Sequence, residues 1–368
     1  MNVVFRCDAS IQIGTGHVMR CLTLADELVR QGANCHFICR EHEGNLIEFI
    51  AQKGHNTYKL NLKHQDSINK KNDEEPKLFH SKWLGSTQED DAKQVLDILS
   101  TIKPEWIVID HYALDKYWEQ KLRPHCDNIL VIDDLADRKH DCDILLDQTF
   151  GRDKQDYQNL VPDHCKILCG TTYALLRPEF SEWRQYSLER RKDSKLQHIL
   201  INLGGVDKDN ITSRILESLK QASLPKSCRI TVVMGSTSPW LEAVTTKANQ
   251  LLWSTIVKTG VSNMAELMSN SDLAIGAAGS TSWERCCLGL PTLMLVIADN
   301  QSDIAKNLES VNAVKILLDT QNLTTIICHN ISMFLKNPKN LMLMSQSSAD
   351  ILDGKGVIRV ANHISGQF

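Results

Sequence analysis

The sequence predicts an α/β protein made of two doubly wound domains that face each other across a cleft. Short apolar runs alternate with amphipathic helical runs in both halves of the chain, a pattern typical of parallel sheets covered by helices. A glycine-containing turn follows the first apolar run of each half, Asn2–Cys7 and His198–Leu203. With 368 residues the chain is too long for one typical core and suits two domains of about 150 to 200 residues.

The composition is that of an ordinary globular protein, with 42% hydrophobic and 23% charged residues. A net charge of −4 and the lack of a long basic run argue against a nucleic acid partner. Met1 leads directly into an apolar strand rather than a secretory leader, so the twelve cysteines are expected to be reduced in a cytoplasmic protein. We expect no metal site, because no CxxC pair occurs, and no stable membrane association.

The first expected strand, Asn2–Cys7, leads into a turn that contains Gly14 and Gly16. A helical run, Val18–Val29, follows this turn. A strand, glycine turn and helix in this order present backbone N–H groups and the positive end of a helix dipole to an anion. His17 is expected on the first helical turn, where the dipole helps to keep it a neutral base. A polar capping residue is the alternative interpretation of this histidine.

The rest of the first half follows the same alternation. We expect strands at Asn34–Arg40, Tyr58–Leu62, Trp106–Asp110, Asn128–Asp134, Asp143–Asp147 and Lys166–Cys169, and helices at Asn45–Lys53 and Glu89–Ile102. The polar, lysine-rich segment 63–85 is expected to be a surface loop or insertion. The sequence divides into an N-terminal domain (1–182), a charged connection (183–197) and a C-terminal domain (198–368).

Polar side chains end two of the expected strands. Asp110, His111 and Tyr112 follow one apolar run, and Asp133 and Asp134 end the next. Because open α/β sheets bind ligands at the carboxyl ends of their strands, the two groups indicate a binding site. Asp133 and Asp134 are also common turn-forming residues, which is the alternative interpretation.

The second half repeats the alternation. We expect strands at His198–Leu203, Arg229–Met234, Ser254–Lys258, Asp272–Gly276 and Thr292–Ile297, and a helix at Asp209–Gln221. The turn after the first of these strands contains Gly204 and Gly205, and the small-residue turn Ala277–Ser280 opens a helix that carries Glu284. The N–H groups of the second turn suit a diphosphate, and a carboxylate one helical turn later suits ribose hydroxyls. A helix-dipole acid is the alternative role of Glu284.

Four segments of the chain together resemble one family: RCDASIQIGTGHVMRCLTLA, VIDHYALD, YALLRPEF and GAAGSTSWERCCLGLPTLML. They are similar to the UDP-2,4-diacetamido-2,4,6-trideoxy-β-L-altropyranose hydrolases of pseudaminic acid biosynthesis, the PseG family. The first segment is specific to this family and its close relatives, whereas the last is shared with other GT-B nucleotide-sugar enzymes. The resemblance implies a GT-B fold of two Rossmann-like domains. It also implies hydrolysis of the anomeric C–O bond, with release of UDP and without metal or cofactor.

The functional residues of the family carry over position by position. Its catalytic histidine falls on His17, which would activate the attacking water, and its ribose-binding glutamate falls on Glu284. Tyr112 matches the tyrosine of the D-H-Y motif, and Arg177 matches the arginine of the Y-A-L-x-R motif. The residues expected to contact the UDP-linked diacetamido sugar are Asp8, Gly14, Gly16, Tyr112, Arg177, Gly204, Gly205, Gly279, Ser280, Thr281 and Glu284.

Two positions leave open questions within this assignment. Asp8 could orient the ring of His17, or it could cap the loop as a structural residue. Trp283 stands where some family members have a substrate-contacting asparagine, so a polar sugar contact is in doubt there.

Three other functions fit the same fold: a glycosyltransferase, an epimerase acting on a UDP-sugar, and a non-catalytic nucleotide-sugar sensor. A glycosyltransferase that works at a membrane usually displays an apolar or basic patch, and the first half contains no such block. Release of free UDP without an acceptor separates hydrolysis from all three.

Overall fold

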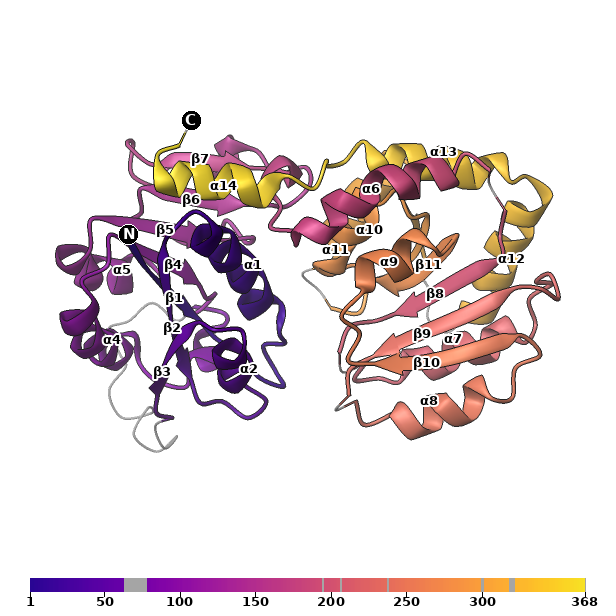
Figure 1. Cartoon of the computed structure of the whole chain (residues 1–368), viewed down its shortest axis with the longest axis horizontal. Helices are drawn as coiled ribbons and strands as arrows, with labels where there is room; N and C mark the ends of the chain where they lie inside the picture. The colour runs from indigo at the N-terminus through magenta and orange to yellow at the C-terminus, as the bar shows by residue number, and fades with distance from the viewer. Residues whose placement is uncertain are drawn as a thin grey trace. The chain divides into compact units, whose positions relative to one another are not determined.

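The computed structural model describes residues 1–62, 78–193, 195–205, 207–236, 238–298, 301–317 and 322–367. The chain forms two compact units, one made of Met1–Leu175 with Gly356–Phe368 and the other of Leu176–Lys355 (Figure 1). Each unit contains a parallel sheet with helices packed on it. This is the doubly wound α/β organisation that the sequence predicts for each half.

The sheet of the first unit has the strand order β3-β2-β1-β4-β5-β6-β7. Its strands are β1 (Asn2–Cys7), β2 (Asn34–Arg40), β3 (Asn56–Leu60), β4 (Trp106–Asp110), β5 (Asn128–Ile132), β6 (Ile144–Asp147) and β7 (Lys166–Cys169). Its α-helices are α1 (Gly16–Arg30), α2 (Ile47–Gln52), α4 (Gln88–Ile102), α5 (Lys116–Leu122) and α14 (Gly356–Ser365). Short 3₁₀ helices lie at Ser81–Leu84, Arg123–His125, Lys154–Tyr157 and Thr171–Tyr173.

Strand β1 is an inner strand of this sheet, third in the strand order, and the chain reverses direction of sheet growth beside it. It pairs with β2 on one side and with β4 on the other, so that Phe5 lies between Phe37 and Val108. The chain builds β2 and β3 outward on one side of β1 and then crosses to β4 on the other side. Loops at the carboxyl ends of β1 and β4 therefore diverge, which creates the switch point where doubly wound sheets bind ligands.

The helix α14 belongs to the first unit, whereas the sequence predicts that residues 198–368 form the C-terminal domain. Its apolar residues Val357, Val360, Ala361 and Ile364 are buried in one cluster with residues of α1 such as Leu24 and Leu28. Figure 1 draws α14 beside α1 and over β6 and β7. The helical spacing of these four residues is visible in the sequence, but it does not reveal which sheet the helix covers.

The sheet of the second unit has the strand order β10-β9-β8-β11-β12-β13. Its strands are β8 (His198–Asn202), β9 (Arg229–Met234), β10 (Ser254–Thr259), β11 (Leu273–Ala277), β12 (Thr292–Leu295) and β13 (Lys315–Ile316). Its helices are α6 (Pro178–Arg190), α7 (Ile211–Leu219), α8 (Leu241–Ala248), α9 (Met264–Ser269), α10 (Thr281–Cys287), α11 (Ser302–Ser310), α12 (Leu323–Lys336) and α13 (Lys339–Ala349).

The charged stretch expected to connect the domains is mostly the helix α6, which packs within the second unit. Its arginines bind main-chain oxygens instead of projecting into solvent. Arg191, just after the helix, donates to the carbonyl oxygens of Met268, Ser271 and Leu288 at 2.8, 2.6 and 3.1 Å. Burial lowers the pKa of Arg191 to about 9. The charged composition of this segment predicts a connection between domains. Composition alone does not show that the arginines donate to carbonyl oxygens within the second unit.

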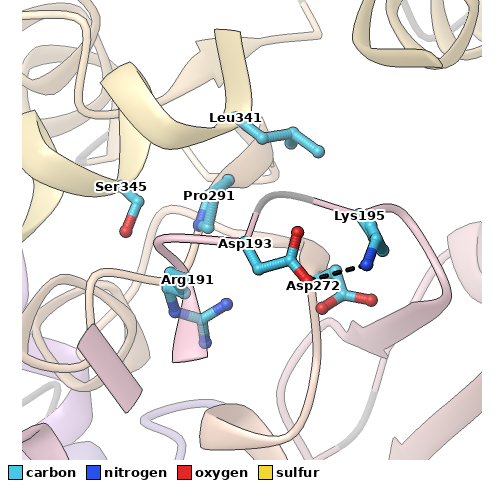
Figure 2. A pocket seen from close by; sticks show the side chains of 7 residues that line it. All are labelled: Arg191, Asp193, Lys195, Asp272, Pro291, Leu341 and Ser345. Carbon is cyan, nitrogen blue, oxygen red and sulfur yellow. Dashed lines mark hydrogen bonds and ion pairs between the residues drawn. The ribbon is translucent and has the colours of Figure 1, made fainter. Parts of the chain in front are cut away.

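A small pocket lies beside Arg191 in the second unit (Figure 2). Its lining residues are Arg191, Asp193, Lys195, Asp272, Pro291, Leu341 and Ser345. Its volume of about 10 Å³ is enough for one water molecule. Asp272 and Pro291 precede β11 and β12, so the pocket lies at the amino ends of these strands, away from the edge where such sheets bind nucleotides.

The lysine-rich segment expected to be a loop falls largely outside the described residues, which resume at Leu78. Its last part contains the 3₁₀ helix Ser81–Leu84 and ends at Gly85, whose φ of +64° is left-handed. None of the helices described above has the length and apolar character needed to cross a membrane.

The placement of α14 predicts that Ile364→Ala destabilises the first unit selectively. Ile364 is 4% exposed, and truncating a buried isoleucine costs about 2 to 5 kcal/mol. Hydrogen exchange should speed up in α1 and β1 while β8 and β11 keep their protection. Ile358→Ala is the matched control, because Ile358 lies on the same helix and is 39% exposed. Unchanged exchange in α1, or equal losses in both units, would contradict this placement.

Candidate functional site

The turn before α1 is closed on itself and presents the start of the helix. The N–H of Gly14 donates to the carbonyl oxygen of Ser10 at 2.9 Å, and Gly14 has a φ of +80° that favours glycine. The side-chain oxygen of Ser10 accepts the N–H groups of Gln12 and Ile13. Helix α1 begins at Gly16, two positions earlier than expected, so its first turn contains His17 as the sequence predicts.

The imidazole of His17 is held by the carboxylate of Asp110 at the end of β4. Nδ1 of His17 lies 2.6 Å from Oδ1 of Asp110, and both side chains are buried. Arg20 binds the same carboxylate through Nε at 2.6 Å and Nη2 at 2.7 Å. Although burial alone would favour the neutral acid, the charge of Arg20 and the hydrogen bonds from Arg20 and His17 hold the pKa of Asp110 well below its usual value. Asp110 is thus an acceptor, Nδ1 of His17 carries the proton, and Nε2 carries the lone pair that a general base needs.

Arg20 extends the network to the next strand end. Its Nη1 donates to Oδ2 of Asp134 at 2.6 Å, and the same oxygen accepts the hydroxyl of Tyr112 at 2.9 Å. The rings of Tyr112 and His17 meet edge to face, with centroids 4.6 Å apart. Burial and the charge of Asp134 raise the pKa of Tyr112 well above its usual value, so its phenol stays a donor. Tyr112 therefore lies beside His17.

The sequence interpretation missed Arg20 and the role of Asp110 as the partner of His17. Arg20 lies one helical turn after His17, so the two side chains share a face of α1, and this spacing was available as a signal. Asp133 behaves as the turn-forming alternative, because its carboxylate accepts the N–H of Ala136 and binds Arg138.

The hypothesis that Asp8 orients His17 is wrong. The carboxylate of Asp8 pairs with Arg6 at 2.7 and 3.0 Å and accepts the backbone N–H of Arg40 at 2.7 Å. Arg6 and Arg40 also share the buried carboxylate of Asp91, and the side chain of Asp8 is 0% exposed. Asp8 therefore belongs to a structural ion network beneath the sheet edge, and its carboxylate is not accessible to a ligand.

In the second unit, the small-residue turn joins β11 to α10 at the carboxyl end of the sheet. Arg285 lies beneath this turn and donates to the carbonyl oxygen of Ala277 at 2.6 Å and to the hydroxyl of Thr281 at 3.2 Å. A Cβ on Gly276 would stand 2.5 Å from Nη1 of Arg285 and 2.9 Å from the carbonyl oxygen of Asn202, so the backbone leaves no room for a side chain here. Gly279 has open space above it within the described part of the chain, as a close approach of ligand to backbone requires.

Glu284 and Arg177 come together at the same end of the second unit. Nη2 of Arg177 lies 3.8 Å from Oε1 of Glu284 and 2.9 Å from Glu179. Burial raises the pKa of Glu284 to about 7, although Arg177 opposes this shift. Its neighbour Trp283, which stands where some family members have asparagine, is only 4% exposed and packs inside the unit.

The glycine turn after β8 lies next to this site, because β8 and β11 are hydrogen-bonded neighbours. Gly204 has a φ of +91°, and the carbonyl oxygen of Gly205 accepts the N–H of Gly235 at 3.1 Å. A Cβ on Gly235 would lie 2.3 Å from that oxygen, so the turns after β8 and β9 touch through their backbones. The predicted glycines and Glu284 thus share one edge of the second sheet. Over the part of the chain that the structure describes, no group of three or more His, Cys, Asp or Glu could hold a metal ion.

Comparison with known proteins shows what the chain is similar to. Residues 198–358 match the glycosyltransferase family 28 C-terminal domain. The chain is 29% identical over 306 residues to a UDP-2,4-diacetamido-2,4,6-trideoxy-beta-L-altropyranose hydrolase of Campylobacter jejuni, with 83% of this chain and 95% of that protein covered. The chain is a PseG-like protein.

A second sequence relative and a solved structure extend the comparison. An uncharacterized protein of Methanocaldococcus jannaschii is 25% identical over 300 residues, and the chain spans about half, 55%, of its length. The crystal structure of MurG from Acinetobacter baumannii has a TM-score of 0.69 at 18% identity and covers 99% of both chains. The protein therefore has the two-domain α/β GT-B fold that the sequence predicts.

The ion pair of Asp110 predicts the tautomer of His17. In the wild-type protein the proton should reside on Nδ1, because the ionised Asp110 can only accept. Long-range ¹H–¹⁵N spectra of the imidazole would report this tautomer directly. Asp110→Asn should change the spectrum, since an amide can also donate, whereas Asp134→Asn should leave it unchanged because Asp134 contacts Arg20 rather than His17. A proton on Nε2 in the wild-type protein would contradict the assignment.

Proposed function

We propose that the protein hydrolyses UDP-2,4-diacetamido-2,4,6-trideoxy-β-L-altropyranose at the anomeric C–O bond and releases UDP. The observation that carries this proposal is the pairing of His17 with Asp110 on the first turn of α1, at the switch point of the first sheet. The similarity to the Campylobacter hydrolase, over 95% of that protein, supports the same reaction.

In the proposed reaction, a water molecule attacks the anomeric carbon while Nε2 of His17 accepts its proton. The carboxylate of Asp110 holds the ring through Nδ1 and stabilises the imidazolium that forms. When the anomeric C–O bond breaks, its electron pair stays on the diphosphate oxygen, so UDP leaves as the anion. The sugar keeps the oxygen of the attacking water. The hydroxyl of Tyr112 donates its proton to Asp134, so its oxygen, beside His17, can accept a hydrogen bond from a hydroxyl or amide N–H of the sugar.

We assign the nucleotide to the second unit. The turn at Gly279, Ser280 and Thr281 and the neighbouring Gly204 and Gly205 offer backbone N–H groups to the diphosphate. Glu284 accepts hydrogen bonds from the ribose hydroxyls, and Arg177 beside it supplies a positive charge.

Glycosyl transfer to an acceptor is the second candidate function, favoured by the match to a glycosyltransferase family 28 domain. Incubation of the purified protein with the UDP-sugar alone separates the two. A hydrolase should release UDP and free sugar in equal amounts without any added acceptor. A transferase would release UDP only when an acceptor is supplied.

Replacing His17 with alanine should remove most turnover and leave UDP binding intact. Loss of a general base costs about 10² to 10⁴-fold in rate. Reaction in ¹⁸O-labelled water should place the label in the sugar and none in UDP, because water attacks carbon. Near-normal turnover in His17→Ala, or label in the phosphate, would rule out this mechanism.

The raised pKa of Glu284 predicts that UDP binds more weakly below pH 7. Above about pH 7 the carboxylate is ionised and accepts charge-assisted hydrogen bonds from the ribose; below it the protonated acid binds less well. Loss of these bonds in Glu284→Ala should cost about 1.5 to 3 kcal/mol of UDP binding by calorimetry.

Glu284→Gln is the control for this pH dependence, because it keeps the shape of the side chain without its titration. Its UDP affinity at pH 6 and pH 8 should differ only by the ionisation of the ligand itself. An identical pH profile for the wild-type protein and this variant would show that Glu284 does not contact the nucleotide.

A further inference from the structure

Beside His17, three aromatic side chains form a continuous surface, which we call the ring cluster: His80, Trp83 and Tyr112. The ring centroids of His80 and Trp83 are 4.3 Å apart, and those of His80 and Tyr112 are 5.3 Å apart. Trp83 and Tyr112 are nearly parallel, with an interplanar angle of 29° at 6.0 Å. Because Tyr112 also touches the ring of His17, the surface starts at the candidate base and extends away from it.

The backbone that carries Trp83 is held firmly against the sheet. Leu84 is 1% exposed and belongs to the core, and Gly85 follows in a left-handed conformation. A Cβ on Gly85 would lie 2.8 Å from the His42 ring and 3.1 Å from Cδ of Arg40, so the chain passes very close to the end of β2. Thr87 then caps α4 by accepting the N–H of Asp90. The ring cluster is therefore preorganised rather than carried on a free loop.

Two of the three rings, His80 and Trp83, are partly open to solvent, and Tyr112 is buried behind them at 8% exposure. Trp83 and His80 are half-buried, whereas Trp118 and Phe5 are 0% exposed. Partial burial lowers the pKa of His80, so its ring is neutral at pH 7 and adds an uncharged aromatic face. A tryptophan that is kept partly exposed on a rigid segment is suited to contact a ligand.

We infer that the ring cluster is the subsite that binds the apolar groups of the hexose. This inference rests on the proposed function, since it places the sugar of a UDP-sugar beside His17. A 2,4-diacetamido-2,4,6-trideoxyhexose carries three methyl groups: C6 and those of its two acetamido groups. Methyl and C–H groups pack favourably on aromatic faces, whereas hydroxyls at C4 and C6 would lose hydrogen bonds to water there. The ring cluster thus selects an N-acetylated deoxy sugar over a fully hydroxylated one.

The test compares Trp83→Leu with the wild-type protein on two substrates, UDP-2,4-diacetamido-2,4,6-trideoxy-β-L-altropyranose and UDP-N-acetylglucosamine. For the diacetamido sugar, Trp83→Leu should lower kcat/KM about tenfold, mainly by raising KM. The binding affinity for UDP-N-acetylglucosamine should change less, and the affinity for UDP should stay the same. Trp83→Phe should restore most of the loss because it restores an aromatic face.

Trp183→Leu serves as the matched control, because Trp183 is a half-buried tryptophan of α6 whose ring contacts Tyr186. It should leave the preference between the two substrates unchanged. An equal loss on both substrates, an equal loss in Trp183→Leu, or no effect of Trp83→Leu would overturn the inference. Circular dichroism of each variant separates these results from misfolding, and Trp83→Phe keeps the test valid if the leucine variant does not fold.

A binding measurement distinguishes failure of the subsite from failure of the proposed hydrolysis. In a His17→Ala background, calorimetry compares binding of the intact diacetamido UDP-sugar with binding of UDP. If the protein hydrolyses the sugar but Trp83→Leu leaves binding and preference unchanged, the subsite is wrong and the function stands. If no hydrolysis occurs yet the intact sugar binds more tightly than UDP in a Trp83-dependent manner, the subsite stands and the hydrolysis is wrong.

Discussion

The buried negative charge of Asp110 is the constraint on which the site of the first unit depends. A carboxylate with no exposed surface at the end of β4 requires cationic or N–H partners, and α1 supplies them from its first turns through His17 and Arg20. These contacts lock the start of α1 against the end of β4. Arg20 then uses its remaining N–H groups to hold Asp134, which in turn holds Tyr112. A single charge thereby positions residues from three different elements.

The second unit organises its site around a positive charge instead. Arg285 is 2% exposed beneath the turn between β11 and α10, where carbonyl and hydroxyl oxygens accept its N–H groups. Burial lowers the pKa of Arg285 to about 10, because the surrounding groups do not fully replace the water that would stabilise its charge. The site of the first unit is thus built around a buried anion, Asp110, and that of the second around a buried cation, Arg285. The first suits proton transfer, and the second suits binding of an anion.

The strands could be predicted well from the sequence, and the partners of charged side chains could not. The bounds of β1, β2, β4, β7 and β9 match the expectations residue for residue, because buried parallel strands are continuous apolar runs. Asp8 and Asp110 both follow such runs, and the sequence does not reveal which of them faces α1. The charged stretch that contains most of α6 was predicted to connect the domains, because the sequence does not reveal that Arg184 and Arg190 donate to carbonyl oxygens far away in the chain. His80 and Trp83 lie at the end of a polar segment that gave no sign of contact with Tyr112.

Helix α14 follows the second unit in the sequence but packs in the first unit. During synthesis residues 1–175 leave the ribosome before residues 176–355, yet the cluster that covers α1 lacks Val357, Val360 and Ile364 until α14 has also been translated. Domains generally fold in the order in which they emerge, so the second unit can complete its core while the first still exposes apolar surface. The unit that carries His17 can thus complete its apolar core only after the second unit has been translated, which links its maturation to synthesis of that unit.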